Sequence, residues 1–117
     1  DDSYNSNPAS LKNALDSIDN LTMKKIGVFG EMRELGASSN QIHQDMYEYA
    51  SKSVEKILCI GEAWTHCKPS KKTDLVIFDN HEELFEYLVS IIDSNTIILV
   101  KGSRSTRMDL IADKLKK

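Results

Sequence analysis

The residues best suited to chemistry lie in three short segments that are rich in charge, amide groups or glycine. These segments are Asp1-Asp-Ser-Tyr-Asn-Ser-Asn-Pro8, Gly30-Glu-Met-Arg-Glu-Leu-Gly36 and Lys101-Gly-Ser-Arg-Ser-Thr-Arg107. Arginine can hold a carboxylate through two parallel hydrogen bonds, and lysine supplies a point charge. Aspartate accepts hydrogen bonds from ribose hydroxyls, and asparagine can pair with amides or nucleotide bases. The segments therefore suggest sites for a carboxylate and a nucleotide, with ordinary polar loops as the alternative.

The second and third segments each contain a compact charged set. In the third, Lys101, Arg104 and Arg107 follow an apolar run closely, and the N–H groups of a helix that begins there would add to an anion site. Ordinary surface cations are the alternative. In the second, Glu31 and Glu34 flank Arg33, an arrangement that could position an ammonium group or simply form a solvated loop.

Several familiar sites are missing from the sequence. The Gly27-x-x-Gly30 spacing is not a dinucleotide fingerprint, and Lys101-Gly-Ser103 has the letters of a P-loop in the wrong order. If the protein uses ATP, its main phosphate site must lie outside these 117 residues. The histidines are scattered at positions 43, 66 and 81, so we expect no metal site. The spacing of Cys59 and Cys67 fits neither a redox pair nor a zinc knuckle, which predicts two reduced thiols.

Chain length and net charge narrow the possible classes of protein further. The 117 residues form one domain by length, and 18 acidic against 15 basic side chains give a net charge of −3. A general nucleic-acid binder usually has the opposite balance. No apolar run approaches the roughly 18 residues that a membrane-spanning helix needs. Because the sequence opens abruptly on Asp1-Asp2 without an initiator methionine, we expect a piece of a longer protein, and two reduced thiols suit a cytoplasmic one.

The elements that position these segments follow from the apolar pattern. Four runs are apolar throughout and rich in β-branched residues, as is typical of parallel strands covered on both faces; they span 26–30, 57–61, 75–78 and 97–100. A short strand at 1–4 is a further possibility. The polar stretch 66–73 predicts a surface loop.

Helical spacing of apolar residues fills the intervals between the runs. The expected buried stripes are Leu11, Ala14, Leu15, Ile18 and Leu21; Ile42, Met46 and Tyr49 or Ala50; Leu84, Leu88, Ile91 and Ile92; and Met108, Ile111 and Leu115. The helices should begin at Pro8 with Asn7 as N-cap, at Ser38 through a Ser38-x-x-Gln41 capping box, at Asp79 or Asn80, and near Thr106.

Alternating strands and helices predict an α/β fold, a Rossmann-like open, mostly parallel sheet with helices on both faces. In such sheets ligands bind beyond the carboxyl ends of the strands. That edge should gather Gly30–Gly36, Gly61-Glu62, Asp79-Asn80 and Lys101–Arg107, which includes two of the three segments described above.

Taken together, the three segments resemble the C-terminal domain of the Mur ligases. The family pattern is similar to D-D-x-Y-N-A-N-P, G-[DE]-M-x-E-L-G and K-G-S-R-x-x-x-M, in this order and spacing, with His43 shortly after the second motif. The match covers essentially the whole chain, and Ser6 replaces the commoner alanine. Within the family, the branch that adds D-alanyl-D-alanine is the most similar.

This resemblance implies the third domain of a three-domain enzyme. The first domain binds the UDP-sugar, the central one holds ATP and Mg²⁺, and the third closes over both. The reaction joins D-alanyl-D-alanine to UDP-N-acetylmuramoyl-tripeptide through an acyl phosphate during peptidoglycan precursor synthesis. The fragment alone should be inactive, with neither a catalytic residue nor a metal ligand of its own.

The resemblance also assigns residues. It places Asp2 at the ATP ribose, with Tyr4, Asn5 and Asn7 around the nucleotide or the domain junction. It places Glu31 and Arg33 in a loop near the incoming dipeptide. Lys101, Gly102, Ser103 and Arg104 match the segment that contacts the incoming amino acid in related ligases. Two alternatives stay open: the equivalent domain of another Mur or folylpolyglutamate-type ligase, and a non-catalytic flavodoxin-like module that binds a nucleotide or a partner.

Overall fold

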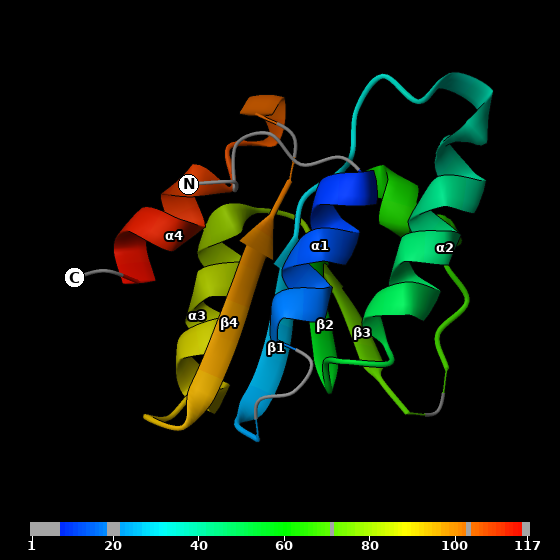
Figure 1. Cartoon of the computed structure of the whole chain (residues 1–117). Helices are drawn as coiled ribbons and strands as arrows, with labels where there is room; N and C mark the ends of the chain where they lie inside the picture. Colours follow the sequence, from blue (N-terminus) through cyan, green and yellow to red (C-terminus); the bar gives the residue numbers. More distant parts are fainter. Residues whose placement is uncertain (1–7, 19–21, 71, 103, 116–117) are drawn as a thin grey trace.

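The computed structural model describes residues 8–18, 22–70, 72–102 and 104–115, and helices alternate with strands along the chain (Figure 1). The main elements are α1 (Pro8–Ile18), β1 (Lys24–Phe29), α2 (Ser39–Ala50), β2 (Lys56–Ile60), β3 (Asp74–Phe78), α3 (His81–Ile91), β4 (Thr96–Lys101) and α4 (Asp109–Leu115). Three short 3-10 turns are η2 (Gly36–Ser38), η3 (Glu62–His66) and η4 (Arg104–Thr106). The expected strand at 1–4, the Asn7 cap and Leu21 lie outside the described residues.

The four strands form one sheet in the order β3-β2-β1-β4. Every neighbouring pair is parallel, with Ile26 opposite Lys56 and Phe29 opposite Lys101 in the two pairs that β1 makes. Because all strands run the same way, their carboxyl ends meet at one edge. The predicted parallel α/β fold is confirmed.

Helices cover both faces of the sheet (Figure 1). Leu11 and Leu15 of α1 share one core cluster with Met46 and Tyr47 of α2. On the opposite face, the second cluster joins α3 and α4 to the sheet through Leu84, Leu88, Met108, Ile111, Ile26, Val28 and Leu58. Side chains alternate along a strand, so Ile57 and Cys59 face the first cluster while Leu58 faces the second.

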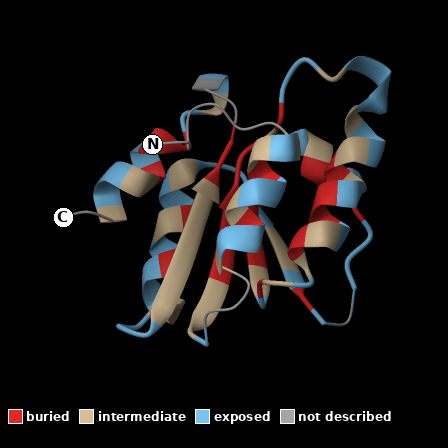
Figure 2. Ribbon diagram, viewed as in Figure 1, coloured by how far each residue is buried: buried red, intermediate tan, exposed pale blue. Residues whose placement is uncertain are grey.

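Burial is deepest in the central strands and falls toward the sheet edges (Figure 2). Every residue of β1 from Ile26 onward is buried, whereas β3 has none that is buried and Ile77 is 37% exposed. The expectation that all four apolar runs are covered on both faces is therefore wrong for β3, and in β4 the run 97–100 is only half-buried. The reason is strand order, because β3 ends the sheet and two helices per face cannot cover every edge.

Helix starts followed the sequence only in part. Asn80 caps α3 as expected, its side-chain oxygen accepting the Glu83 N–H at 2.8 Å. The Ser38 capping box is wrong: Ser38 has helical dihedrals, and its N–H donates to the Leu35 carbonyl instead. The turn η2 thus leads the chain directly into α2. The last helix begins later than expected, since Thr106 belongs to η4 and α4 starts at Asp109.

Two further expectations need correction. Helix α2 buries His43 and Tyr47 together with the expected Met46 and Ala50. The stretch 66–73 is exposed at most described positions, but Thr73 is fully buried. The Tyr47 hydroxyl donates to the Thr73 carbonyl at 2.7 Å, which ties this loop to α2.

Candidate functional site

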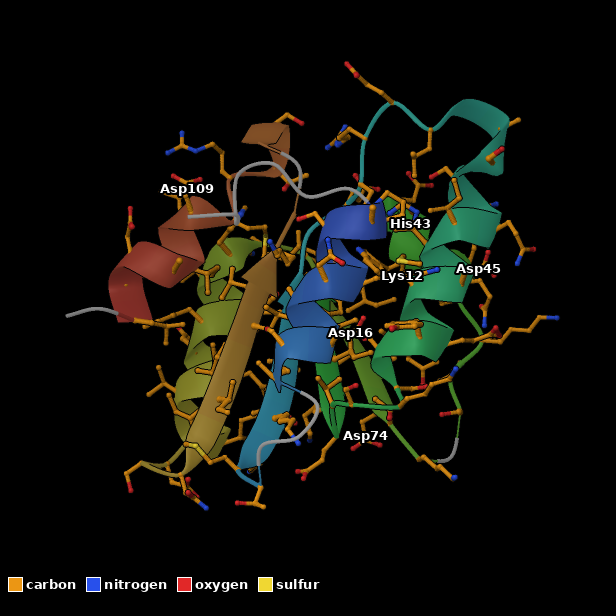
Figure 3. The ribbon with its side chains drawn as sticks, viewed as in Figure 1. Lys12, Asp16, His43, Asp45, Asp74 and Asp109 are labelled. Atoms are coloured by element: carbon orange, nitrogen blue, oxygen red, sulfur yellow. The ribbon has the colours of Figure 1, made fainter. Side chains whose placement is uncertain are left out.

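The carboxyl edge of the sheet gathers the candidate residues, as the parallel topology requires. Figure 3 shows His43 and Asp109 toward this end of the molecule and Asp74, which opens β3, at the other. The loops after β1 and β4 lie side by side, because these strands pair along their whole length and the Gly30 N–H donates to the Lys101 carbonyl at 2.7 Å. Glu31 and Lys101, distant in sequence, thus belong to one edge.

Glu31 links the loops after β1 and β2. Its Oε2 accepts the Ala63 N–H at 2.8 Å, and its Oε1 lies 3.2 Å from a guanidinium nitrogen of Arg33. The Glu31 side chain is 17% exposed and that of Arg33 is 53% exposed. Gly61 makes this contact possible, because a Cβ there would lie 2.1 Å from Glu31 Cγ. The carboxylate therefore positions two loops, while Arg33 presents its guanidinium at the surface.

His43 of α2 binds the same loop from the interior of the domain. The ring is fully buried, and its Nε2 accepts the Met32 N–H at 3.1 Å. Its Nδ1 lies 2.7 Å from the Ser39 carbonyl oxygen. The Trp64 ring meets the imidazole edge-on with centroids 4.7 Å apart, and it also packs against Phe29. The sequence analysis noted His43 only for its place after the second motif, and it could not predict this contact because the partner of the histidine is a backbone amide.

Lys101 differs from the expectation of an open cation. Its side chain is buried, at 3% exposure, and its Nζ donates to Ser10 Oγ of α1 at 3.3 Å. Gly102 follows it and packs closely: a Cβ there would lie 2.6 Å from Met108 Cγ and 3.2 Å from Gly30 Cα. Lys101 thus joins the end of β4 to the first turn of α1, directly behind the loop.

A second polar cluster lies where η4 leads into α4. The Arg107 guanidinium donates to both carboxylate oxygens of Asp109 at 3.0 Å, and this pairing lowers the pKa of Asp109. Arg107 itself has a left-handed backbone, with φ of 54°. The Nε2 of His81 lies 2.9 Å from the Thr106 carbonyl oxygen. The sequence did not single out this connection between α3 and η4.

A shallow cleft of about 310 Å³ opens beyond the ends of β2 and β3; it is lined by Ile60, Gly61, Glu62, Thr65, Ile77, Phe78 and Asp79. Both cysteines are free and buried. Burial raises the pKa of Cys67 to about 11 and that of Cys59 as well, so neither thiol is a ready nucleophile.

Of the residues assigned by resemblance, the structure brings Glu31 and Arg33 into direct contact and sets Lys101 and Gly102 beside them. Arg104 opens η4 at the same edge. The remaining assigned residues lie outside the described part of the chain: Asp2, Tyr4, Asn5, Asn7 and Ser103. Among the described residues, no group of three histidine, cysteine or carboxylate side chains could hold a metal ion.

These features define a small α/β domain whose candidate loops lie at the carboxyl ends of a parallel sheet, the edge where folds of this class bind ligands. The family model for the Mur ligase, glutamate ligase domain matches residues 2–104, and the chain belongs to this family. Every described helix is too short or too polar to traverse a bilayer.

Relatives of known name agree with this family. The chain is 32% identical to the UDP-N-acetylmuramoyl-tripeptide–D-alanyl-D-alanine ligase of Rickettsia prowazekii, with 96% of the chain and 26% of that protein covered. It is 36% identical to the ligase of the same name from Buchnera aphidicola subsp. Acyrthosiphon pisum, with 98% and 26% covered. The chain therefore spans about a quarter of the length of these relatives.

Solved structures show the same fold. A MurF ligase from Thermotoga maritima in complex with ADP superposes with a TM-score of 0.82 at 24% identity, covering 95% of this chain and 26% of that one. A MurF from Acinetobacter baumannii gives 0.80 at 27% identity, covering 98% and 27%.

Proposed function

We propose that this chain is the C-terminal domain of an ATP-dependent ligase that joins D-alanyl-D-alanine to UDP-N-acetylmuramoyl-tripeptide in the cytoplasm. The observation that carries the proposal is a family match over residues 2–104 together with relatives that bear this ligase name. The product would be a peptidoglycan precursor, so the protein would serve cell wall synthesis. The partners of the domain would be the N-terminal and central domains of the same enzyme.

The domain's part in the reaction is positioning. An amine must be held next to an activated carboxyl group, and such positioning can lower a barrier by several kcal/mol. The sequence contains no P-loop, which fits an enzyme whose ATP is held mainly by another domain. The described residues also offer no metal-binding group. In this proposal Mg²⁺ belongs to the central domain.

The carboxyl edge supplies chemistry that suits the dipeptide. Its carboxylate needs a cation, and Arg104 opens the turn that follows β4. Glu31 and Arg33 hold the neighbouring loop in a defined shape, 3.2 Å apart. Gly102 and Ser103 complete the segment. Lys101 supports it from behind through Ser10, which makes a direct contact with the dipeptide less favoured than the sequence suggested.

The nucleotide side of the proposal depends on the residues that precede α1. Asp2 would accept a hydrogen bond from the ATP ribose, with Tyr4, Asn5 and Asn7 around the nucleotide or the domain junction. Their support is connectivity: the segment leads directly into α1, whose Ser10 receives the Lys101 hydrogen bond at the end of β4. A ligand held there would lie between this domain and the preceding one.

The test compares the chain alone with the full-length protein that contains it. We expect ATP-dependent phosphate release only from the full-length protein, and only with both D-alanyl-D-alanine and the UDP-tripeptide present. Replacing the dipeptide by L-lysine or D-glutamate checks for a sibling ligase, and activity with one of those alone would refute the substrate assignment. Tight binding of ATP to the isolated chain would instead support a self-sufficient nucleotide-binding module.

A further inference from the structure

The geometry points to His43 as a positioning residue that fixes the loop 30–36 by accepting the Met32 N–H, and so holds Glu31 and Arg33 in place for the dipeptide. This inference rests on the proposed function for the identity of the substrate. The hydrogen bond itself, at 3.1 Å from a fully buried ring, is independent of it. Nothing in the spacing of residues marked His43 for this task.

Both ring nitrogens are committed, and their partners define the state of the ring. A carbonyl oxygen only accepts, so the hydrogen between His43 and the Ser39 carbonyl, 2.7 Å apart, lies on Nδ1. A backbone N–H only donates, so Nε2 must offer its lone pair to Met32. The ring is therefore a neutral imidazole with its hydrogen on Nδ1, since any other state would place two donors or two acceptors face to face.

The imidazole anchors the loop, which has no regular secondary structure, to helix α2. Residues 30–35 make no helix or strand, and Glu34 adopts a left-handed backbone with φ of 64°. Three consecutive loop residues are held differently. Glu31 binds the Ala63 N–H in the loop after β2, Met32 binds α2 through His43, and Arg33 extends outward. Without an acceptor for the Met32 N–H, this tie between the centre of the loop and α2 is lost.

Packing holds the ring in the orientation that these bonds need. Trp64 meets the imidazole at an interplanar angle of 90°, and Phe29 packs against the indole with ring centroids 5.9 Å apart. Trp64 and Phe29 are both essentially inaccessible to solvent. The imidazole therefore cannot rotate away from the Met32 N–H without displacing Trp64 and Phe29. A positioning residue needs its side chain locked by packing in this way.

A matched pair of substitutions separates positioning from simple core filling. In His43→Gln, the amide lies as many bonds from Cα as Nε2 does, so its oxygen can accept the Met32 N–H. In His43→Asn, the amide corresponds to Nδ1, so it can reach the Ser39 carbonyl but leaves the Met32 N–H without an acceptor. His66→Gln is the control, since His66 is exposed.

In the full-length ligase, we expect His43→Asn to raise KM for D-alanyl-D-alanine about tenfold, the effect of an unsatisfied buried donor. KM for ATP should change little, and His43→Gln should recover most of the loss. Equal losses in the Gln and Asn variants, or a parallel shift of the KM values for all substrates, would overturn the positioning role.

Measurements on the chain alone test whether His43 accepts the Met32 N–H as inferred, without any ligase assay. We expect the ¹⁵N spectrum of the imidazole to show a neutral ring with its hydrogen on Nδ1, and the Met32 amide to exchange slowly in the wild type and in His43→Gln. Fast exchange of this amide in the wild type, or a hydrogen on Nε2, refutes the inference even if the protein is a ligase. If the wild-type ligase rejects D-alanyl-D-alanine while these signals are as expected, the proposed function fails and the positioning role stands.

Discussion

The loops after β1 and β4 lie side by side at the same edge, yet they are held by opposite means. The loop after β1 is fixed by side chains that reach across space, with Glu31 bound to Ala63 and His43 bound to Met32. The loop after β4 is fixed by close approach, with Gly102 packed on Met108 and on the backbone of Gly30. The conformation of the first loop depends on polar groups that are present, and that of the second depends on side-chain atoms that are absent.

This difference determines which changes are informative. Around the loop after β1, removing a polar group should release the backbone, whereas around the loop after β4, adding a methyl group should displace it. Gly61 combines the two cases. It lies against the Glu31 side chain, and it must lack a side chain of its own because a Cβ there would overlap with Glu31.

The largest effect should come from Gly61→Ala. Gly61 has φ of 129°, a region open almost only to glycine, and its new Cβ would lie 2.1 Å from Glu31 Cγ. Backbone strain and steric overlap together should lower the free energy of unfolding by about 3–5 kcal/mol. Urea unfolding followed by the fluorescence of Trp64, the only tryptophan, measures this change.

Gly36→Ala is the matched control for that experiment. Gly36 also has a positive φ, 59°, but a Cβ there meets nothing within 4 Å. Only the left-handed backbone should matter, at a cost of about 1–2 kcal/mol. Equal destabilisation by the two substitutions would mean that the contact with Glu31 does not constrain Gly61.

The second prediction asks which loop would recognise the dipeptide in the proposed function. In the proposed full-length ligase, Arg104→Lys keeps the charge but loses the planar fork of donors, so kcat/KM for D-alanyl-D-alanine should fall roughly tenfold to a hundredfold. KM for ATP should change little. Arg33→Lys is the counterpart in the other loop. Its effect should be smaller, because Arg33 already pairs with Glu31 and lysine can keep that attraction. If Arg33→Lys had the larger effect, we would infer that the loop after β1 recognises the dipeptide carboxylate.

The third prediction concerns the close approach after β4. Gly102→Ala would place a Cβ 2.6 Å from Met108 Cγ and 2.8 Å from Thr106 Oγ1. The Met108 side chain can shift, so we expect a loss of about 1–2 kcal/mol in unfolding free energy, in the lower part of the range for overpacking. The double variant with Met108→Ala serves as the check: less additional destabilisation by Gly102→Ala in that background would identify Met108 as the obstacle.

The fold could be predicted because its signals are local. Four apolar runs and the helical stripes between them gave the strands and helices, and the cap at Asn80 depends on a side chain acting three residues ahead. The failures arose where a distant or competing contact decides. Ser38 lost its expected cap to a preceding 3-10 turn, and the exposure of Ile77 follows from a strand order that no single run encodes.

The site was predictable in its place and less so in its contacts. Parallel topology put the polar segments at one edge, and Glu31 with Arg33 meets there as their sequence proximity suggests. Lys101 was expected to face a ligand but is buried behind the loop against Ser10, which lies 91 positions away in the chain. His43 was not selected, because its partner is a backbone N–H and every residue except proline has one.

The smallest effect should come from the ion pair beside η4. Arg107 lowers the pKa of Asp109, so the ionised carboxylate stabilises the fold at pH values above the ordinary range of aspartate, near 3.9. As the pH falls through the lowered pKa, the carboxylate is protonated and this contribution disappears. Arg107→Gln keeps a side chain of similar volume but removes the charge and the two guanidinium hydrogen bonds to Asp109, so it should be slightly less stable than the wild type near pH 6. The difference should shrink to nothing in strong acid. Urea titrations at a series of pH values measure it, with Arg33→Gln as a control, because the Arg33–Glu31 pair is about equally exposed. A deficit that stays constant down to the lowest pH would mean that Arg107 contributes through packing rather than through its charge, as Gly102 does in the same loop after β4.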